Sequence, residues 1–192
     1  MRYLNQLDYR HIHYEHNVED GGVPQERRNI ATSGCGICCC CMLIEQLTHY
    51  ELSLHECIRL IYRAGANKRK GLQMTVFGQP LADEFGLGYK ASSSMDELLA
   101  CLQKGGRAVI NVGGDHDDYV GLYSNGGHCI LAISYDGNEL CILDPGYKPG
   151  KYESAPRAGK VRVDDPFTYC KPQFIAEDTQ NRELPFHLFW RK

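Results

Sequence analysis

The chain has 192 residues, 43% of them hydrophobic, and a formal net charge of -3 at pH 7. This length and composition suit one domain with a sizeable buried core, which we expect to span residues 1–192. The slightly acidic balance excludes the basic surface that nucleic acids and anionic membranes require, so neither is expected as a partner.

No segment predicts insertion into a membrane or export through one. The longest apolar run, residues 37–44, is much shorter than a membrane-spanning helix, and residues 1–17 lack the apolar centre of a signal peptide. We therefore expect a cytoplasmic protein, with secretion still open if a leader was removed.

The ten cysteines are not spaced like a disulfide scaffold. Four of them are consecutive, at positions 38 to 41, and neighbours on a helix point in different directions and cannot pair with one another. Reduced thiols in a reducing compartment are the simpler interpretation. We interpret residues 39–41 as small apolar side chains of a buried helix.

The first predicted helix follows a polar segment that ends near residue 29. It covers roughly residues 35–47 and is apolar nearly all round, so we expect it at the centre of the core. Thr32 and Ser33 precede it as candidate capping residues. Its position and composition make it the element most closely tied to the chemistry described below.

Three further helices are predicted between residues 53 and 106. One begins after Ser53, which forms a capping box with Glu56. The next is expected between residues 75 and 86, interrupted by a glycine and a proline. The last begins at Ser94 and ends at the glycines of residues 105–106.

The second half of the chain is predicted to form strands. The patterns typical of strands cover residues 107–112, 128–135, 139–143, 160–163 and 185–190. Asp136 and Gly137 form a turn between the second and third of these strands. Helices over about residues 30–105, followed by an antiparallel sheet over about residues 106–192, indicate an α+β fold.

The small-residue segment around Cys35 carries the strongest chemical signal. Cys35 lies between Gly34 and Gly36 at the start of the first predicted helix. The first turn of a helix presents unpaired N–H groups and the positive end of the helix dipole, which favour a thiolate over a thiol. We interpret Cys35 as a nucleophile.

Two segments resemble the signatures of bacterial cysteine peptidases related to the bacteriocin-leader (double-glycine) peptidases. The first is residues 30–36, followed by a Met-Leu pair at residues 42–43. The second combines the Gly-His strand start at residues 127–131, the turn at residues 136–137 and the Leu-Asp-Pro of residues 143–145. The resemblance extends over about residues 5–144.

This resemblance implies a papain-like cysteine proteinase fold, with the nucleophile on a central helix and the other catalytic groups on the sheet. It implies Cys35 as the nucleophile, His128 as the general base and acid, and Asp144 as the group that orients the imidazole. It further implies a cysteine peptidase or amide hydrolase that acts on a peptide or protein substrate through a thioester, with no metal and no cofactor.

Hairpin geometry adds a requirement of its own. His128 and Asp144 can meet only if they lie on the same face of neighbouring strands. A two-residue turn at residues 136–137 would put Asp144 on the opposite face. A three-residue turn pairs Ser134 with Asn138 and sets Asp144 directly across from His128. We therefore predict this bulged turn or an equivalent one-residue shift.

Cys38 is the alternative nucleophile. The residues from Cys35 to Cys38 partly match the Cys-Gly-x-Cys of papain and the cathepsins, in which the later cysteine reacts. In addition, Ile37-Cys38 stands where the bacterial peptidases usually have Pro-Thr. We prefer Cys35, because glycines flank it at the helix start while Cys38 lies one turn deeper.

The resemblance also implies a glutamine upstream of the nucleophile as a donor to the oxyanion. Gln6 matches it best, and Gln25 and Asn29 remain alternatives. The backbone N–H of Cys35 would supply the second donor in each case.

Other polar clusters have structural interpretations. We expect residues 115–118 to form a solvated loop that precedes the strand of residues 128–135 and can act as a flap over the substrate. An exposed polar segment is the expected setting of His11, His13 and His16.

Three functional classes remain open from the sequence. The leading one is the cysteine peptidase or amide hydrolase, whose site would serve an acyltransferase if an amine or thiol replaced water. The second is a catalytically inactive papain-like module that binds peptides. The third is a cysteine-rich metal or redox protein, which the spacing of the cysteines supports least.

Overall fold

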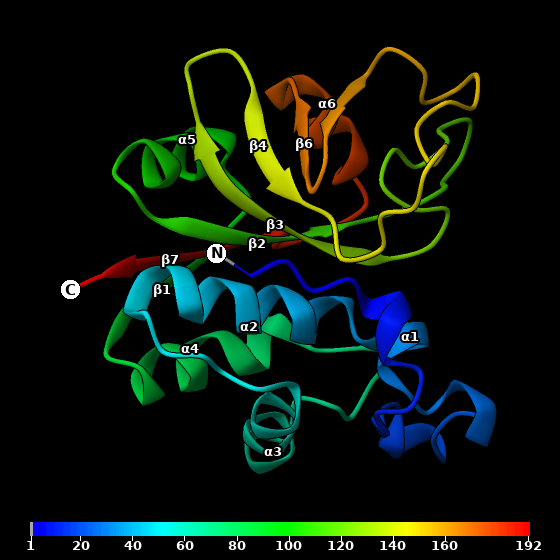
Figure 1. Ribbon diagram of the computed structural model, residues 1–192, viewed down its shortest axis with the longest axis vertical. Coiled ribbons are helices and arrows are strands. Elements are labelled where there is room, and N and C mark those ends of the chain that lie inside the picture. Colours follow the sequence, from blue (N-terminus) through cyan, green and yellow to red (C-terminus); the bar gives the residue numbers. More distant parts are fainter. Residues whose placement is uncertain (1) are drawn as a thin grey trace.

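The computed structural model describes residues 2–192 and contains a seven-stranded sheet with helices on both faces (Figure 1). The strand order is β1-β7-β2-β3-β4-β6-β5, and each neighbouring pair is antiparallel. The strands are β1 Leu87–Ser92, β2 Arg107–Val112, β3 His128–Tyr135, β4 Leu140–Leu143, β5 Val161–Asp164, β6 Phe167–Cys170 and β7 Phe186–Arg191.

The helices form two unequal layers around this sheet. Helices α1 to α4 lie on one face and α5 and α6 on the other (Figure 1). Their bounds are α1 Ile30–Ser33, α2 Cys35–Thr48, α3 Leu54–Ala64, α4 Met74–Glu84, α5 Met95–Gln103 and α6 Pro172–Asp178. Three short 3-10 helices precede them, η1 Gln6–Tyr9, η2 Val18–Asp20 and η3 Gln25–Arg27.

Each face of the sheet has its own apolar core, because successive side chains of a strand point to opposite faces. In β2, Val109 packs into the core that contains α2, whereas Ala108 and Ile110 pack into the core that contains α5. The central strands are therefore apolar on both faces. This explains why they read as nearly continuous apolar runs in the sequence.

Helix α2 is buried almost all round, as predicted. Residues 36–44 are buried without exception, and the four consecutive cysteines are free thiols within this core. A helix buried in this way is held rigidly by its surroundings. Its first residue, Cys35, is consequently fixed relative to the sheet.

The predicted helix starts are correct for α3 and α5. The hydroxyl oxygens of Ser53 and Ser94 accept hydrogen bonds from the backbone N–H groups of Glu56 and Glu97, respectively. The prediction for α2 is wrong in its cap. Thr32 and Ser33 belong to α1, and the residue before α2 is Gly34, which offers no side chain.

The order of helices and strands also differs from the prediction. Strand β1 was not predicted, and it separates α4 from α5, so the chain does not finish its helices before it begins the sheet. Strand β1 alternates apolar residues (Leu87, Tyr89 and Ala91) with other residues, a short strand pattern that the prediction overlooked, and it is held by pairing with β7. Strand β6 and helix α6 were also missed, and Pro80 lies inside α4 without ending it.

The β3–β4 hairpin is longer at its turn than predicted. Tyr135 pairs with Leu140, so residues 136–139 connect the strands, and the expected pair of Ser134 with Asn138 is wrong. Ser134 pairs instead with Cys141.

A one-residue shift within the hairpin has the consequence that the prediction required. Between Ala132 and Ser134 the register moves by one residue, and beyond that point Leu131 pairs with Leu143. Continued by one residue, this register sets Asp144 opposite Ile130, on the same face as His128. The required parity is thus present, but it arises from an irregularity inside β3 and not from the turn.

Candidate active site

Cys35 is the first residue of α2, at the end of that helix where α1 meets it (Figure 1). Gly34 has no side chain that could accept a hydrogen bond from the first backbone N–H groups of α2. These groups and the helix dipole favour a negative charge on the Cys35 sulfur. Cys35 is partly exposed, whereas Cys38 is completely buried.

The two glycines beside Cys35 allow close packing at this helix start. A Cβ atom on Gly34 would lie 2.6 Å from the carbonyl oxygen of Ile30, and one on Gly36 would lie 3.1 Å from Leu72. Neither approach is possible with a larger residue unless the neighbours move. The glycines therefore let α1 and the Leu72 loop pack directly against the nucleophile candidate.

His128 and Asp144 are hydrogen-bonded to each other. The Nε2 atom of His128, at the first position of β3, lies 2.7 Å from Oδ1 of Asp144, just beyond the end of β4. Both side chains are buried. Because Nε2 is engaged by Asp144, Nδ1 is the ring nitrogen left to interact with Cys35.

The protonation states of Cys35 and His128 depend on each other. Hydrogen bonds to the Cys35 sulfur from Cys129 and from His128 outweigh the effect of burial and hold the pKa of Cys35 well below its ordinary value. Burial alone would lower the pKa of His128, but its hydrogen bonds to Asp144 and Cys35 raise this pKa to about 9. At neutral pH the arrangement favours a thiolate–imidazolium pair.

Asp144 is held ionised by several donors. Its Oδ1 accepts a hydrogen bond from the N–H of Gly146 at 2.8 Å, and its Oδ2 accepts from Lys151 Nζ and from the Tyr152 hydroxyl, each at 2.5 Å. Burial would raise the pKa of Asp144, but the His128 hydrogen bond and the charges of His128 and Lys151 lower it strongly. Lys151 and Tyr152 carry no sequence motif and were not predicted.

Cys129 is a third residue of the site that was not predicted from the sequence. It follows His128 in β3, so its side chain points to the opposite face, toward the core that contains α2. There its thiol and backbone N–H both contribute hydrogen bonds to the sulfur of Cys35. Strand alternation beside the candidate histidine is the only sequence signal that could have identified it.

Cys38 lies in a different environment from Cys35. It is completely buried in α2, and burial raises its pKa well above the ordinary value. A buried thiol with a raised pKa is a poor nucleophile. These properties favour Cys35 over Cys38.

The three candidate oxyanion donors are well separated. Gln6 borders the same pocket as His128, a cavity of about 310 Å³. The Asn29 side chain instead caps α1 by accepting a hydrogen bond from the N–H of Thr32, and it borders a different pocket together with Gln25. Gln25 is exposed there.

Gln6 is fixed in place at this pocket. Its Nε2 donates to the carbonyl oxygen of Ala31 at 2.9 Å, and its backbone N–H donates to that of Pro145 at 2.7 Å. The side chain thus spans the segment before Cys35 and the segment after Asp144. Among residues 2–192, its buried Oε1 has no hydrogen-bond partner.

The acidic loop and the N-terminal histidines show mixed outcomes. Residues 115, 117 and 118 are exposed, and Asp115 accepts hydrogen bonds from Gly121 and Asn125, which closes the loop beside the His128 pocket. His11 and His13 are exposed as predicted. The prediction is wrong for His16, which is buried and accepts a hydrogen bond from the N–H of Gly71.

Within residues 2–192, no three side chains among His, Cys, Asp and Glu converge in a way that could hold a metal ion. No helix in the described part of the chain has the length and apolar content needed to cross a membrane.

Comparisons with known proteins identify the fold. No protein family model matches the sequence, and no curated protein matches it. Among solved structures, the chain is similar to a protein from Bacillus anthracis described as a "putative C39-like peptidase", with a TM-score of 0.53 and 12% sequence identity. The match covers 83% of this chain and 89% of that one. At this identity the likeness shows the fold, a mixed arrangement of helices and antiparallel sheet.

Proposed function

We propose that this protein is a cysteine peptidase or amide hydrolase with Cys35 as nucleophile, His128 as general acid and base, and Asp144 as the orienting carboxylate. The observation that carries the proposal is one continuous series of contacts: the Cys35 sulfur to His128, and His128 Nε2 to Asp144 Oδ1 at 2.7 Å. The C39-like fold supports the same class of activity.

The first half of the reaction forms a thioester. The Cys35 thiolate attacks the carbonyl carbon of the amide, and the negative charge moves to the carbonyl oxygen. The N–H of Cys35 and the amide of Gln6 stabilise that oxyanion. When the tetrahedral intermediate collapses, the C–N bond breaks and protonated His128 gives its proton to the departing amine.

The second half of the reaction releases the acid. Neutral His128 takes a proton from water, and the resulting hydroxide attacks the thioester carbonyl. The C–S bond then breaks, the carboxylic acid leaves, and the Cys35 thiolate and the His128 imidazolium are regenerated. Asp144 keeps Nε2 of His128 protonated throughout, so that Nδ1 is the nitrogen that exchanges protons at the sulfur.

Peptide cleavage by matched variants tests this proposal. Purified protein is incubated with a mixture of synthetic peptides of varied sequence, and the products are identified by mass spectrometry. Wild-type protein and Cys38→Ala should release the same fragments, whereas Cys35→Ala and His128→Ala should release none. Equal cleavage by Cys35→Ala, or loss confined to Cys38→Ala, would overturn the assignment.

A further inference from the structure

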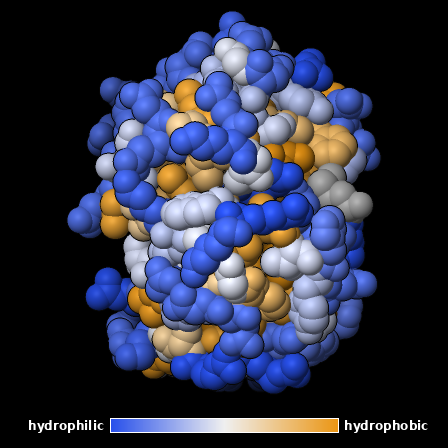
Figure 2. All heavy atoms as spheres, turned by 90° about the vertical axis from the view of Figure 1, so that its left-hand side faces the viewer, coloured by the Kyte–Doolittle hydropathy of each residue, from blue (hydrophilic) through white to orange (hydrophobic). Residues whose placement is uncertain are grey.

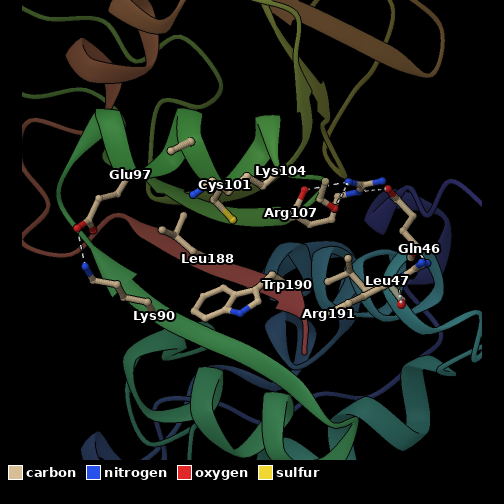
Figure 3. Close-up of a pocket in the computed structure, with 13 residues that line it drawn as sticks. Gln46, Leu47, Lys90, Glu97, Cys101, Lys104, Arg107, Leu188, Trp190 and Arg191 are labelled. Carbon is tan, nitrogen blue, oxygen red and sulfur yellow. Dashed lines mark hydrogen bonds and ion pairs between the residues drawn. The ribbon is translucent and has the colours of Figure 1, made fainter.

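A second pocket lies at the opposite end of α2 from Cys35. It has a volume of about 750 Å³ and is bordered by the end of α2, by α5 and by the last residues of β7 (Figure 3). This volume falls in the range of sites that bind small molecules. Figure 2 views this end of the molecule and shows apolar side chains set among hydrophilic ones.

The middle of this pocket is apolar and contains the indole of Trp190. Trp190 is 39% exposed, and its indole lies beside Leu188 (Figure 3). Its position depends on Gly88 in β1, since a Cβ atom there would lie 2.2 Å from the indole ring. The glycine therefore lets the indole rest against β1 and leaves part of the ring facing the pocket.

One end of the pocket is lined by cationic side chains, and its two arginines donate hydrogen bonds to uncharged acceptors only. Arg107 Nε donates to Gln46 Oε1 at 2.7 Å, and Arg191 Nε donates to the carbonyl oxygen of Leu47 at 2.6 Å. Within residues 2–192, neither guanidinium forms an ion pair with a carboxylate, and the same is true of Lys104.

The other end of the pocket is different, because Lys90 there is paired with Glu97 (Figure 3). Positive charge without a partner is thus confined to the Arg107 end. Burial and the nearby charge of Arg191 also lower the pKa of Arg107, which indicates that the two guanidinium groups repel each other. An anion between them would relieve this repulsion.

The guanidinium groups retain donors for such an anion. The hydrogen bonds of Arg107 use Nε and Nη1, and those of Arg191 use Nε and Nη2. Nη2 of Arg107 and Nη1 of Arg191 have no acceptor among residues 2–192. Arginine N–H groups match the two oxygens of a carboxylate well.

We propose that this pocket binds a small amphiphilic carboxylate, whose carboxylate group lies between Arg107 and Arg191, near Lys104, and whose apolar part lies against Trp190. The site is separate from the proposed catalytic residues and does not depend on their activity. A ligand with only one of the two parts would use half of the pocket.

The fluorescence of Trp190 provides a direct test, since it is the only tryptophan in the chain. Selective excitation of Trp190 is used to titrate octanoate, with 1-octanol as the uncharged match and inorganic phosphate as an anion without an apolar part. Octanoate should change the emission in a saturable way and bind about tenfold or more tightly than 1-octanol. Phosphate, which lacks an apolar part, should also bind more weakly than octanoate.

Charge variants then locate the site. Lys104→Gln changes an exposed side chain with no hydrogen bond in the described structure, and Arg191→Lys keeps the charge but removes the planar fork. Both should weaken octanoate binding severalfold, while Arg10→Gln, which removes an exposed charge elsewhere, should not. Equal affinity for octanoate and 1-octanol, or wild-type affinity in both pocket variants, would overturn the proposal.

Discussion

At the scale of single residues, the reactivity of Cys35 is set by the groups that touch its sulfur. Cys129 hydrogen-bonds to this sulfur through its thiol and its backbone N–H, and its side chain lies on the face of the sheet that packs against α2. His128, the preceding residue of β3, hydrogen-bonds to the same sulfur. Two consecutive residues of one strand therefore contact the same sulfur from different directions. This is possible because Cys35 lies at the end of its helix, beside the start of β3.

Removal of the Cys129 thiol tests this arrangement. Cys129→Ala deletes one hydrogen bond to the Cys35 thiolate, so the pKa of Cys35 should rise. The rate of alkylation of Cys35 by iodoacetamide, measured against pH by mass spectrometry, should then reach its plateau at a higher pH than in the wild type. Cys129→Ser keeps a donor and should restore much of the wild-type profile. Identical profiles for Cys129→Ala and wild type would contradict the role of Cys129.

The Asp144 carboxylate should control the alkaline limit of activity. Its contact with His128 helps to hold the pKa of His128 at about 9, so Asp144→Asn should lower that pKa. Amide hydrolysis requires a protonated His128, so the decline of the rate on the alkaline side should begin at a lower pH in the variant than in the wild type. The maximum rate should also fall, by roughly 10²-fold to 10⁴-fold. The measurement is the pH dependence of kcat/KM on a cleaved peptide.

Asp178→Asn is the matched control for this variant. Asp178 is also a buried carboxylate, but its oxygens accept hydrogen bonds from the N–H groups of Leu122 and Tyr123 and none from His128. Its replacement should reduce stability without moving the alkaline limit. A similar shift in both variants would mean that loss of stability, and not the His128 pKa, determines the profile.

The sequence identifies some of these residues and not others. Cys35, His128 and Asp144 lie in short motifs with recognisable chemistry, so they could be named in advance. Lys151 and Tyr152 reach Asp144 from the loop that follows β4, and no motif predicts how such a loop closes. Their role depends on packing that only the folded chain shows.

At the scale of elements, helix starts could be predicted more reliably than strands. A serine followed by a glutamate three residues later predicts a local hydrogen bond at a helix start, and such bonds do form at Ser53 and Ser94. Strand β1 offers only a short alternation of apolar and other residues, and its stability comes from pairing with β7, almost 100 residues away in the chain. The shift within β3 likewise depends on contacts across the sheet and not on the turn residues.

Strand β7 should make the protein sensitive to mild acid. His187 is buried, and its Nδ1 lies 2.9 Å from the Tyr89 hydroxyl in β1; burial lowers its pKa to about 4 from an ordinary 6.5. The unfolded chain therefore takes up a proton at His187 in a pH range where the folded chain does not. The resulting stability is present above pH 6.5 and is lost as the pH falls toward 4, by up to about 3 kcal/mol.

Urea denaturation at a series of pH values measures this effect. Burial also lowers the pKa of His16, which adds a loss in the same direction, so the relevant quantity is the difference between wild type and His187→Gln. The free energy of unfolding should depend less steeply on pH in that variant between pH 6.5 and 4. The exposed His11→Gln variant should keep the wild-type slope. Equal slopes for wild type and His187→Gln would refute the assignment.

At the scale of the whole molecule, the two ends of α2 have different environments. The first residue of α2 interacts with His128, which borders the pocket beside Gln6, while the last turn of α2 borders the cationic pocket with Trp190. The buried middle of the helix separates these ends. The mixed helix and sheet class and the presence of a central apolar helix could be predicted from the sequence. The placement of α5 and α6 on the second face of the sheet could not, because no local pattern indicates which face of a sheet a helix covers.

Selective alkylation is the sharpest test of whether Cys35 is an activated thiolate. Within residues 2–192, Cys35 and Cys101 are the two partly exposed cysteines, and burial raises the pKa of Cys101 while the pKa of Cys35 is lowered. Folded protein is treated briefly with iodoacetamide at mildly acidic pH, and the modified peptides are mapped by mass spectrometry. We expect one adduct, on Cys35, and an unmodified Cys101; equal modification of both cysteines, or an unmodified Cys35, would show that Cys35 is not an activated thiolate.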